Sequence, residues 1–272
     1  MNQIEIYKLL NKSNCGECKV RSCMGFAVSV VNGQRKLQDC PHLSSETSEK
    51  IEGSITIRDH RDEIEKLIDP LKKEIGKVDF EKAALGLGAE IKNGMLAVRC
   101  LGKEFIIDKE GNIHTLCHVN PWLKAPLFHY IINSGSSELT RQWISYGELK
   151  NGIIMDQYFN RRCEEPLREI ADKYPTFLDD MLTVFHGKPV NMEMADVSWI
   201  IYPLPKVPFL IMYWKGEEQE EQHKGEISFE SKLKILFDKA TDEYINYEII
   251  YVLGRGLVEM FTKISQKHYD LS

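Results

Sequence analysis

Residues 11–43 read NKSNCGECKVRSCMGFAVSVVNGQRKLQDCPHL and hold four of the seven cysteines in a chain of 272 residues. Cys15, Cys18 and Cys23 are crowded together, whereas Cys40 follows only after sixteen further residues and directly precedes a proline. The spacing is therefore C-x2-C-x4-C-x16-C. In a reducing compartment, clustered cysteines are more often metal ligands or redox groups than disulfide partners. The stretch predicts a metal centre.

An iron–sulfur cluster explains this spacing best. A cubane needs four converging thiolates, and a common arrangement takes three from one tight loop and the fourth from a distant segment. Gly16 lets the loop turn sharply, and Lys19 and Arg21 would offset the negative charge of a cluster. A structural zinc site is the alternative, but zinc usually takes two C-x2-4-C pairs, and the second pair is missing. The predicted metal ligands are Cys15, Cys18, Cys23 and Cys40.

Length and composition predict two unequal domains. A chain of 272 residues exceeds one average domain, and its 43% hydrophobic and 28% charged residues are close to soluble averages. We expect a 4Fe-4S cluster-binding domain at residues 1–45 and a larger domain at residues 46–272, with the polar stretch SSETSEK at their junction. The first domain has too few apolar side chains to fold by burial alone, so a metal centre is expected to hold it together.

Charge and hydropathy restrict the partners and the compartment. Residues 1–45 carry six Lys or Arg against three Asp or Glu, while the rest of the chain has 29 basic and 38 acidic residues. This balance argues against nucleic acid as the main partner, because phosphate binding needs a larger basic surface. No apolar run fits a signal peptide, and no segment approaches the roughly 20 apolar residues of a membrane span. We expect a cytoplasmic protein with no membrane partner.

Helices and strands are expected in mixed order, which predicts an α+β fold: a small helical cluster domain followed by a larger domain with antiparallel strands. Two short helices should flank the cysteine loop, the second ending at Gly33. The first helix carries Ile6, Leu9 and Leu10 on one face. The second helix contains the apolar residues Met24, Phe26, Ala27, Val30 and Val31. Further helices are expected at residues 57–76, 78–90, 125–135, 175–187 and from about 242 to 267, with strand pairs at 94–111 and 196–216.

Residues 6–43 resemble the small 4Fe-4S domain at the N-terminus of the large subunit of the corrinoid iron-sulfur protein of acetyl-CoA metabolism. The stretch that carries the resemblance is IYKLLNKSNCGECKVRSCMGFAVSVVNGQRKLQDCPHL. In that family all four cysteines ligate one cluster, which passes single low-potential electrons to a cobalt corrinoid and rescues its inactive oxidised state. The resemblance implies the same ligand roles here, and low-potential electron transfer or reductive activation of a corrinoid.

The rest of the chain departs from that subunit. About 227 residues are few for a barrel plus a corrinoid domain, and no D-x-H-x-x-G cobalt-binding motif is present. This part resembles instead an uncharacterised family of anaerobe proteins, a domain of unknown function often found behind this type of cluster domain. The stretches that carry this likeness are VRCLGKEFIID, FHYIINSG, WISYGEL, YPLPKVPFLIMYW and ILFD. This second resemblance implies no activity.

Three histidines are candidate contacts for a corrinoid. His114 and His118 are spaced i, i+4 around Cys117 in HTLCH, but this segment is expected to be loop or strand end and lacks the glutamate of a zinc-protease motif. His129 lies in a region rich in aromatic residues. Core packing is the simpler explanation for most of these rings, although an aromatic-lined cavity for a flat cofactor would use the same residue types.

The remaining cysteines predict no second cluster. Cys100 is expected to be a buried small hydrophobe and Cys163 a surface thiol. No catalytic residue is predicted, because the chain has no evident nucleophile–base pair, nucleotide loop or radical C-x3-C-x2-C motif. Three functions stay open: an electron-transfer protein with a redox partner protein, a corrinoid carrier with an attached cluster, and an enzyme that uses the cluster directly. We expect the first.

Overall fold

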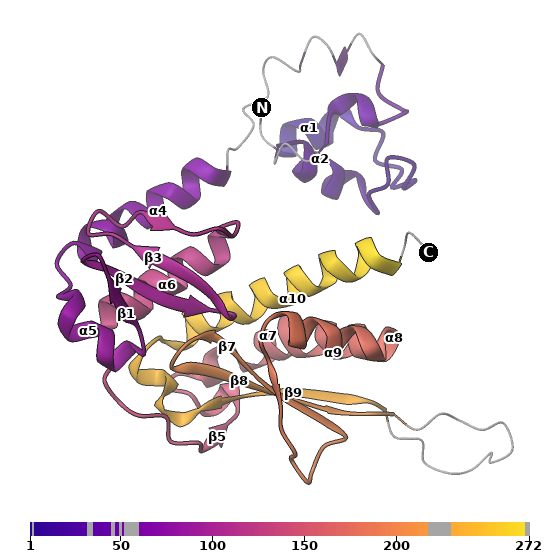
Figure 1. Ribbon diagram of the computed structural model, residues 1–272. Helices are drawn as coiled ribbons and strands as arrows, with labels where there is room; N and C mark the ends of the chain where they lie inside the picture. The colour runs from indigo at the N-terminus through magenta and orange to yellow at the C-terminus, as the bar shows by residue number, and fades with distance from the viewer. Residues whose placement is uncertain are drawn as a thin grey trace, which may run out of the picture. The chain divides into compact units, whose positions relative to one another are not determined.

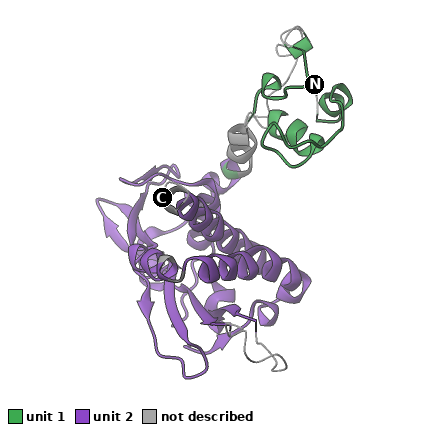
Figure 2. Ribbon diagram, turned by 90° about the vertical axis from the view of Figure 1, so that its right-hand side faces the viewer, with its two compact units in different colours: residues 1–68 green, residues 69–272 purple. Residues whose placement is uncertain are grey.

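The chain folds into two compact units, residues 1–68 and 69–272 (Figure 2). The computed structural model describes residues 1, 3–31, 35–44, 47–48, 51, 60–216 and 230–269. The predicted junction at residues 45–46 and the predicted helix end at Gly33 lie outside the described residues. Helices and antiparallel sheets make up the described part, so the α+β class is confirmed.

The first unit is a small helical domain around the cysteine loop. Helix α1 spans Gln3–Leu9, α2 spans Cys23–Val31, and the short 3-10 helix η1 spans Leu37–Asp39. Its core consists of Ile6, Leu10, Cys23, Phe26, Ala27, Val30, Val31, Leu37 and Cys40. Leu9 was predicted to share a helical face with Ile6 and Leu10 but is 37% exposed, because it lies off the buried stripe of its helix. Met24 of the second helix is 40% exposed for the same reason.

The second unit is built on two antiparallel sheets (Figure 1). The first is a meander in the order β1-β2-β3-β4, and the second has the order β5-β9-β8-β7-β6. The strands are β1 (Glu90–Lys92), β2 (Met95–Cys100), β3 (Lys103–Ile107), β4 (Ile113–His114), β5 (Trp143–Ile144), β6 (Lys188–Pro189), β7 (Val197–Leu204), β8 (Val207–Trp214) and β9 (Lys232–Asp238). Both predicted strand pairs are present, as β2–β3 and β7–β8.

Helices surround these sheets. They are α5 (Phe80–Leu87), α6 (Pro121–Asn133), α7 (Asp156–Phe159), α8 (Glu165–Lys173), α9 (Pro175–Val184) and α10 (Tyr247–Tyr269). Helix α4 (His60–Ile75) begins in the first unit and ends in the second. Short turns are η2 (Tyr146–Glu148), η3 (Gly152–Ile154), the π-helical η4 (Asn160–Glu164) and η5 (Lys239–Glu243). Helix α8 contacts β9 and α10, so these helices cover one face of the second sheet (Figure 1). Strand β8 is buried at seven of its eight residues, which places it at the centre of the core.

Helices α6 and α9 begin or end at other residues than the sequence predicted. Helix α6 begins at Pro121, four residues early, because a proline at the first helical position fits the start of a helix. It is ended by Ser134, whose φ of 46° is left-handed, and not by Gly135. Helix α9 ends at Val184, short of the predicted Gly187. The predicted ends of both helices therefore lie one to three residues beyond the observed ends.

The last helix also begins later than predicted. Helix α10 starts at Tyr247 rather than near Asp242, because residues 239–243 form the 3-10 turn η5. A Cβ placed on Gly256 would lie 2.2 Å from the ring of Trp122, so α10 and α6 approach closely there. Although α10 is 23 residues long, no helix in the described part of the chain is both long and apolar enough to cross a membrane.

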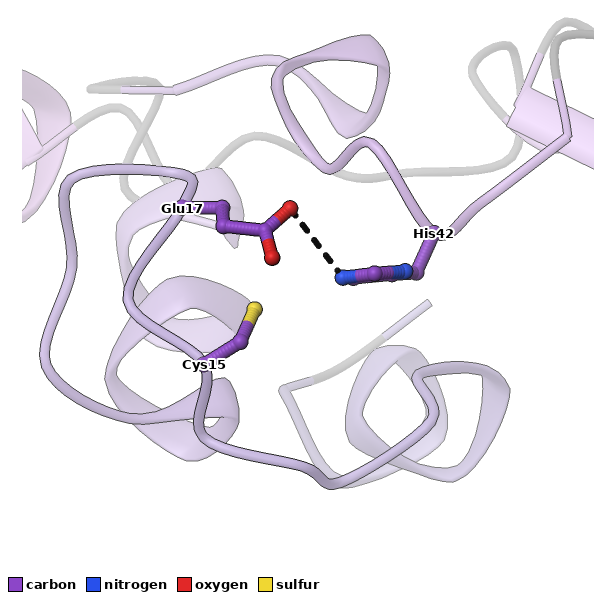
Figure 3. Close-up of side chains that lie close together, drawn as sticks. All are labelled: Cys15, Glu17 and His42. Carbon is purple, nitrogen blue, oxygen red and sulfur yellow. Dashed lines mark ion pairs between the residues drawn. The ribbon is translucent and has the colours of Figure 1, made fainter.

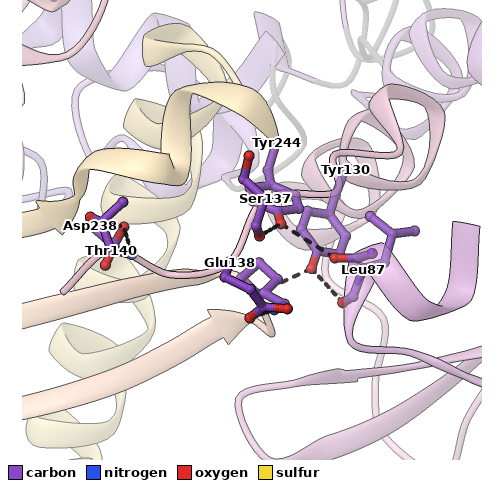
Figure 4. A network of polar contacts seen from close by, with 9 residues as sticks. Leu87, Tyr130, Ser137, Glu138, Thr140, Asp238 and Tyr244 are labelled. Carbon is purple, nitrogen blue, oxygen red and sulfur yellow. Dashed lines mark hydrogen bonds and ion pairs between the residues drawn. The ribbon is translucent and has the colours of Figure 1, made fainter.

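A polar network fixes the loop between α6 and β5 (Figure 4). The buried carboxylate of Asp238 accepts hydrogen bonds from the backbone N–H and the hydroxyl of Thr140, at 3.0 and 2.9 Å. Tyr244 donates to the carbonyl of Ser137, and Tyr130 donates to a carbonyl at the end of α5 at 2.6 Å. Burial raises the pKa of both phenols, that of Tyr244 to about 12, so both stay protonated donors. This network gives a structural role to Tyr130, the neighbour of His129 in the aromatic-rich region.

Candidate metal centre

The four predicted ligands surround one pocket of the first unit. The pocket is lined by Leu10, Asn11, Asn14, Cys15, Gly16, Cys18, Val20, Cys23, Phe26, Cys40 and Pro41. All four cysteines are free thiols. The fold therefore brings together side chains that are separated by up to 25 positions in the sequence.

Left-handed residues shape the loop before α2. Lys12, Asn14, Gly16 and Lys19 have φ angles of 60°, 52°, 76° and 60°. Turns with such residues can direct successive backbone N–H groups to one side, forming the anion-binding concavities found at phosphate and iron–sulfur sites. The side chain of Asn14 accepts a hydrogen bond from the N–H of Cys23 at 2.8 Å, which ties the loop to the start of α2.

The four thiols differ in exposure. Cys23 and Cys40 are 8% and 7% exposed and belong to the core of the unit. Cys18 is half-buried and Cys15 is exposed. A metal group held here would therefore be shielded on the side of Cys23 and Cys40 and open to solvent at Cys15.

The four thiols are not gathered as closely as a single zinc ion would require. No three of the four sulfur atoms lie within 4.8 Å of one another; all four cysteines belong to the described residues. Four sulfurs on a tetrahedral zinc ion, with bonds of about 2.3 Å, would lie about 3.8 Å apart. The free volume of the pocket is about 10 Å³, which is less than a cluster needs, so binding a cluster requires the loop or its side chains to rearrange. The donor set fits the iron–sulfur cofactor, and its binding would order the loop.

Two further side chains converge on Cys15 (Figure 3). The ligand atoms of Cys15, Glu17 and His42 all lie within 4.8 Å of one another, and Nε2 of His42 is 3.3 Å from Oε2 of Glu17. All three residues are exposed. Sequence reasoning missed this group, although each member has a signal: Glu17 stands between Cys15 and Cys18, and His42 follows two residues after Cys40.

The three candidate histidines lie on different parts of the second unit. His114 is exposed on β4, with Nε2 3.0 Å from Oδ2 of Asp108, and His118 is exposed in the following loop, so HTLCH is strand and loop as predicted. His129 is half-buried on α6, and burial lowers the pKa of its imidazole. Within the described part of the chain, His114, Cys117 and His118 do not bring three ligand atoms within 4.8 Å of one another.

The enclosed apolar cavity of the second unit is small. It is lined by Leu167, Ile201, Phe209, Ile211, Ile235, Gly254, Leu257, Val258 and Phe261. Its free volume of about 10 Å³ is room for about one water molecule, far below the 300–1,000 Å³ of typical ligand pockets. Phe128, Tyr130 and Tyr146 are buried, as expected for core aromatics. This cavity cannot hold a corrinoid ring.

The prediction for Cys163 was wrong. Cys100 is buried as predicted, but Cys163 is fully buried too, because it sits on the inner side of the π-helical turn η4, where α10 packs closely at Gly254. A Cβ placed on Gly254 would lie 3.3 Å from the sulfur of Cys163. Burial raises the pKa of both thiols, that of Cys163 to about 12, so neither is a thiolate ligand at neutral pH.

The same turn buries a carboxylate that sequence reasoning missed. Glu164 is 5% exposed and accepts hydrogen bonds from Nζ of Lys234 at 2.6 Å, from the N–H of Ile235 at 3.0 Å and from the side chain of Asn160 at 2.8 Å. π-Helical turns often mark functional sites, but these bonds give this one a structural role that ties α7 and α8 to β9.

Comparison with known proteins shows that the cysteine-rich part of the first unit is similar to iron–sulfur proteins. Residues 10–42 match the family described as "Putative Fe-S cluster". The chain is 42% identical over 52 residues to the Acetyl-CoA decarbonylase/synthase complex subunit gamma of Methanopyrus kandleri, covering 19% of this chain and 11% of that protein. It is 39% identical over 51 residues to the Corrinoid/iron-sulfur protein large subunit of Moorella thermoacetica, with coverages of 19% and 11%. The chain thus spans about a tenth of the length of these relatives.

The larger part of the chain has its own relatives. Residues 79–260 match the family described as "Domain of unknown function (DUF3786)". The chain belongs to this family, and its cluster domain precedes the matched region. Both predicted resemblances are thereby confirmed. No solved structure gives a significant match to the chain.

Proposed function

We propose that the chain is a low-potential electron-transfer protein whose first domain, residues 1–45, holds one 4Fe-4S cluster on Cys15, Cys18, Cys23 and Cys40. The observation that carries this proposal is the convergence of four free thiols on one pocket. Four thiolates are the usual ligand set of a cubane cluster. When bound, the cluster supplies one-electron redox chemistry.

The residues of the chain have separate tasks in this proposal. Leu10 and Phe26 line the pocket and are buried, so they exclude water from its inner side. Lys19 and Arg21 are exposed on the loop between the ligands and offset the negative charge of the cluster. Cys15 lies at the open edge, so electrons enter and leave there when a redox partner docks.

A corrinoid is the favoured electron acceptor. The similarity to a protein named Corrinoid/iron-sulfur protein large subunit supports this acceptor, although it extends over 51 residues only. In the proposal the corrinoid is carried by a partner protein, because the enclosed apolar cavity described above is too small for it. A larger pocket of the second unit, of about 420 Å³, is an open groove lined by the charged residues Glu74, Lys77, Asp79 and Lys82, which does not suit a flat apolar ring. The alternative is a corrinoid carrier in which His114, His118 or His129 contacts the cofactor on this chain.

Cobalamin separates the two functions. The anaerobic, dithionite-reduced chain, freed of excess reductant, is mixed with cobalamin, and the corrinoid absorption is followed. Electron transfer without tight binding, absent from Cys23→Ala, supports the proposed relay. Tight stoichiometric binding that weakens in His114→Ala, His118→Ala or His129→Ala replaces it with the carrier function. If the chain neither reduces nor binds cobalamin, corrinoid chemistry is ruled out for it.

A further inference from the structure

We infer that Cys15, Glu17 and His42 form a second metal site, which binds a single divalent transition-metal ion when no cluster is present. The three side chains point toward one another from two segments of the first unit (Figure 3). Their ligand atoms lie within 4.8 Å of one another. Glu17 and His42 do not line the four-cysteine pocket, so the site lies on the solvent side of Cys15.

The distance between the histidine and the carboxylate matches one edge of a tetrahedral ion site. Two ligands with metal bonds of about 2.0–2.1 Å are about 3.3–3.4 Å apart on the edge of a tetrahedron. Nε2 of His42 and Oε2 of Glu17 are 3.3 Å apart. The set of one sulfur, one nitrogen and one oxygen favours zinc, ferrous iron or cobalt over magnesium or calcium, which prefer oxygen ligands alone.

Local turns hold both ligands in place. The N–H of Lys19 donates to the carbonyl of Gly16 at 2.8 Å, and this turn carries Glu17. The N–H of Leu43 donates to the carbonyl of Cys40 at 3.2 Å, and that turn carries His42. The side chains of His42 and Glu17 are 38% and 57% exposed, so an ion can reach them from solvent. Three protein ligands leave a fourth position for water or another small ligand.

The second site competes with the cluster for one thiol. This consequence rests on the proposed function, in which Cys15 is a cluster ligand. A thiolate bound to a single ion is not available to a cubane, so the two metal groups exclude each other. A zinc ion bound to Cys15, Glu17 and His42 would therefore block cluster assembly at its exposed corner.

Cobalt is the probe for the site. The full-length, cluster-free chain is titrated anaerobically with Co²⁺, and the thiolate-to-cobalt absorption is recorded. Because residues 1–45 are expected to unfold when no metal is bound, binding of the ion is coupled to their refolding. We expect His42→Ala and Glu17→Gln to weaken Co²⁺ binding about tenfold or more. The matched control is His114→Ala, which removes another exposed histidine paired with a carboxylate and should leave the affinity within about twofold.

A pair of cysteine variants tests which thiol binds. Cys15→Ala should abolish the thiolate-to-cobalt band, and Cys18→Ala, which alters only the pocket, should retain it. If Cys18→Ala weakens binding as strongly as Cys15→Ala while His42→Ala and Glu17→Gln have no effect, the four-cysteine pocket holds the ion and the inference is wrong.

Iron content keeps this test independent of the proposed function. His42→Ala and Glu17→Gln, purified anaerobically, should contain as much iron as the wild type, because neither residue is a predicted cluster ligand. Zinc added before cluster reconstitution should lower the yield in the wild type and lower it less in His42→Ala. Equal inhibition of both chains would contradict competition at Cys15. If the wild-type chain assembles a normal amount of cluster but binds no Co²⁺ when it is cluster-free, the second site is wrong and the proposed function stands.

Discussion

The two units of the chain are held together by different means. The first has a core of nine buried residues, two of which are the predicted ligands Cys23 and Cys40. The second has two sheets, a central strand buried at seven of eight residues, and a network of hydrogen-bonded tyrosines. In the proposed function a metal group contributes to the fold of the first unit, whereas we expect apolar packing to be sufficient for the second.

The cysteines of the two units also differ in their environment. Those of the first unit surround a pocket, while Cys100 and Cys163 of the second are buried and have raised pKa values. A thiol that burial keeps protonated cannot ligate iron without a large cost in free energy. Cysteine content alone is therefore a poor guide to the site, and the environment of each thiol distinguishes ligand from core residue.

The largest expected effect comes from removing a buried ligand. Cys23→Ala or Cys40→Ala should eliminate most of the iron, because each change removes both a thiolate and part of the small core. Cys100→Ala and Cys163→Ala should keep wild-type iron content and only leave small cavities. Iron per chain after anaerobic purification measures this difference. Equal iron loss in both pairs would show that the ligand assignment is wrong.

Removal of the metal should unfold one part of the chain and not the other. Chelation should unfold residues 1–45, while the larger domain, residues 46–272, keeps its fold, because its core does not include the predicted ligands. Hydrogen exchange resolves the two parts: fast exchange in α1 and α2, with unchanged protection in β8 and β9. Cooperative loss of protection along the whole chain would contradict this independence.

A change confined to the second unit should lower the stability of that unit and leave the iron content unchanged. Gly256→Ala places a methyl group against the ring of Trp122, 2.2 Å away before relaxation. The gain in helix propensity is about 1 kcal/mol, but we expect overpacking to outweigh it and to leave a net loss of about 1–2 kcal/mol. Urea unfolding measures the loss, and iron content should not change. Val252→Ala, at an exposed position of α10, is the control.

The smallest expected effect is a pH-dependent one at Asp108. Burial alone would raise the pKa of its carboxyl group, but hydrogen bonds from His114 and Asn112 hold it at about 2. Because the folded pKa lies below the unfolded value of about 3.9, the stabilisation is complete above that value and is lost as pH falls toward 2. Asp108→Asn should therefore cost about 1 kcal/mol at pH 7, and less with falling pH.

Unfolding at several pH values between 7 and 3 tests this. The difference in stability between wild type and Asp108→Asn should stay constant down to about pH 5 and then shrink. Asp180→Asn, which changes an exposed carboxylate on α9, is the control. A difference that grows as the pH falls would mean that the sign of the linkage is wrong.

Much of the fold was predictable because its signals are local. Both strand pairs were predicted from two apolar runs around a Gly-containing or proline-rich turn, and Cys100 pairs with Lys103 across the first of these turns. Helix ends were less predictable, since the left-handed residue that ends α6 is Ser134 although the neighbouring Gly135 is the stronger signal. The burial of Cys163 was missed because it depends on a π-helical turn, which has no recognised sequence pattern.

Only the part of the site with a local sequence signal was predictable. Spacing alone selected the four cysteines that line the pocket. It could not select Glu17 and His42, because their approach depends on how the turn after Cys40 returns to the loop at Cys15. Contacts between residues 25 positions apart are set by tertiary packing and have no period in the sequence.

Metal analysis of the anaerobically purified chain tests the central claim most directly. The account predicts a brown protein with about four iron atoms per chain, matching acid-labile sulfide, and a reduced-cluster EPR signal after addition of dithionite. Stoichiometric zinc without iron, retained under the same anaerobic handling, would contradict it.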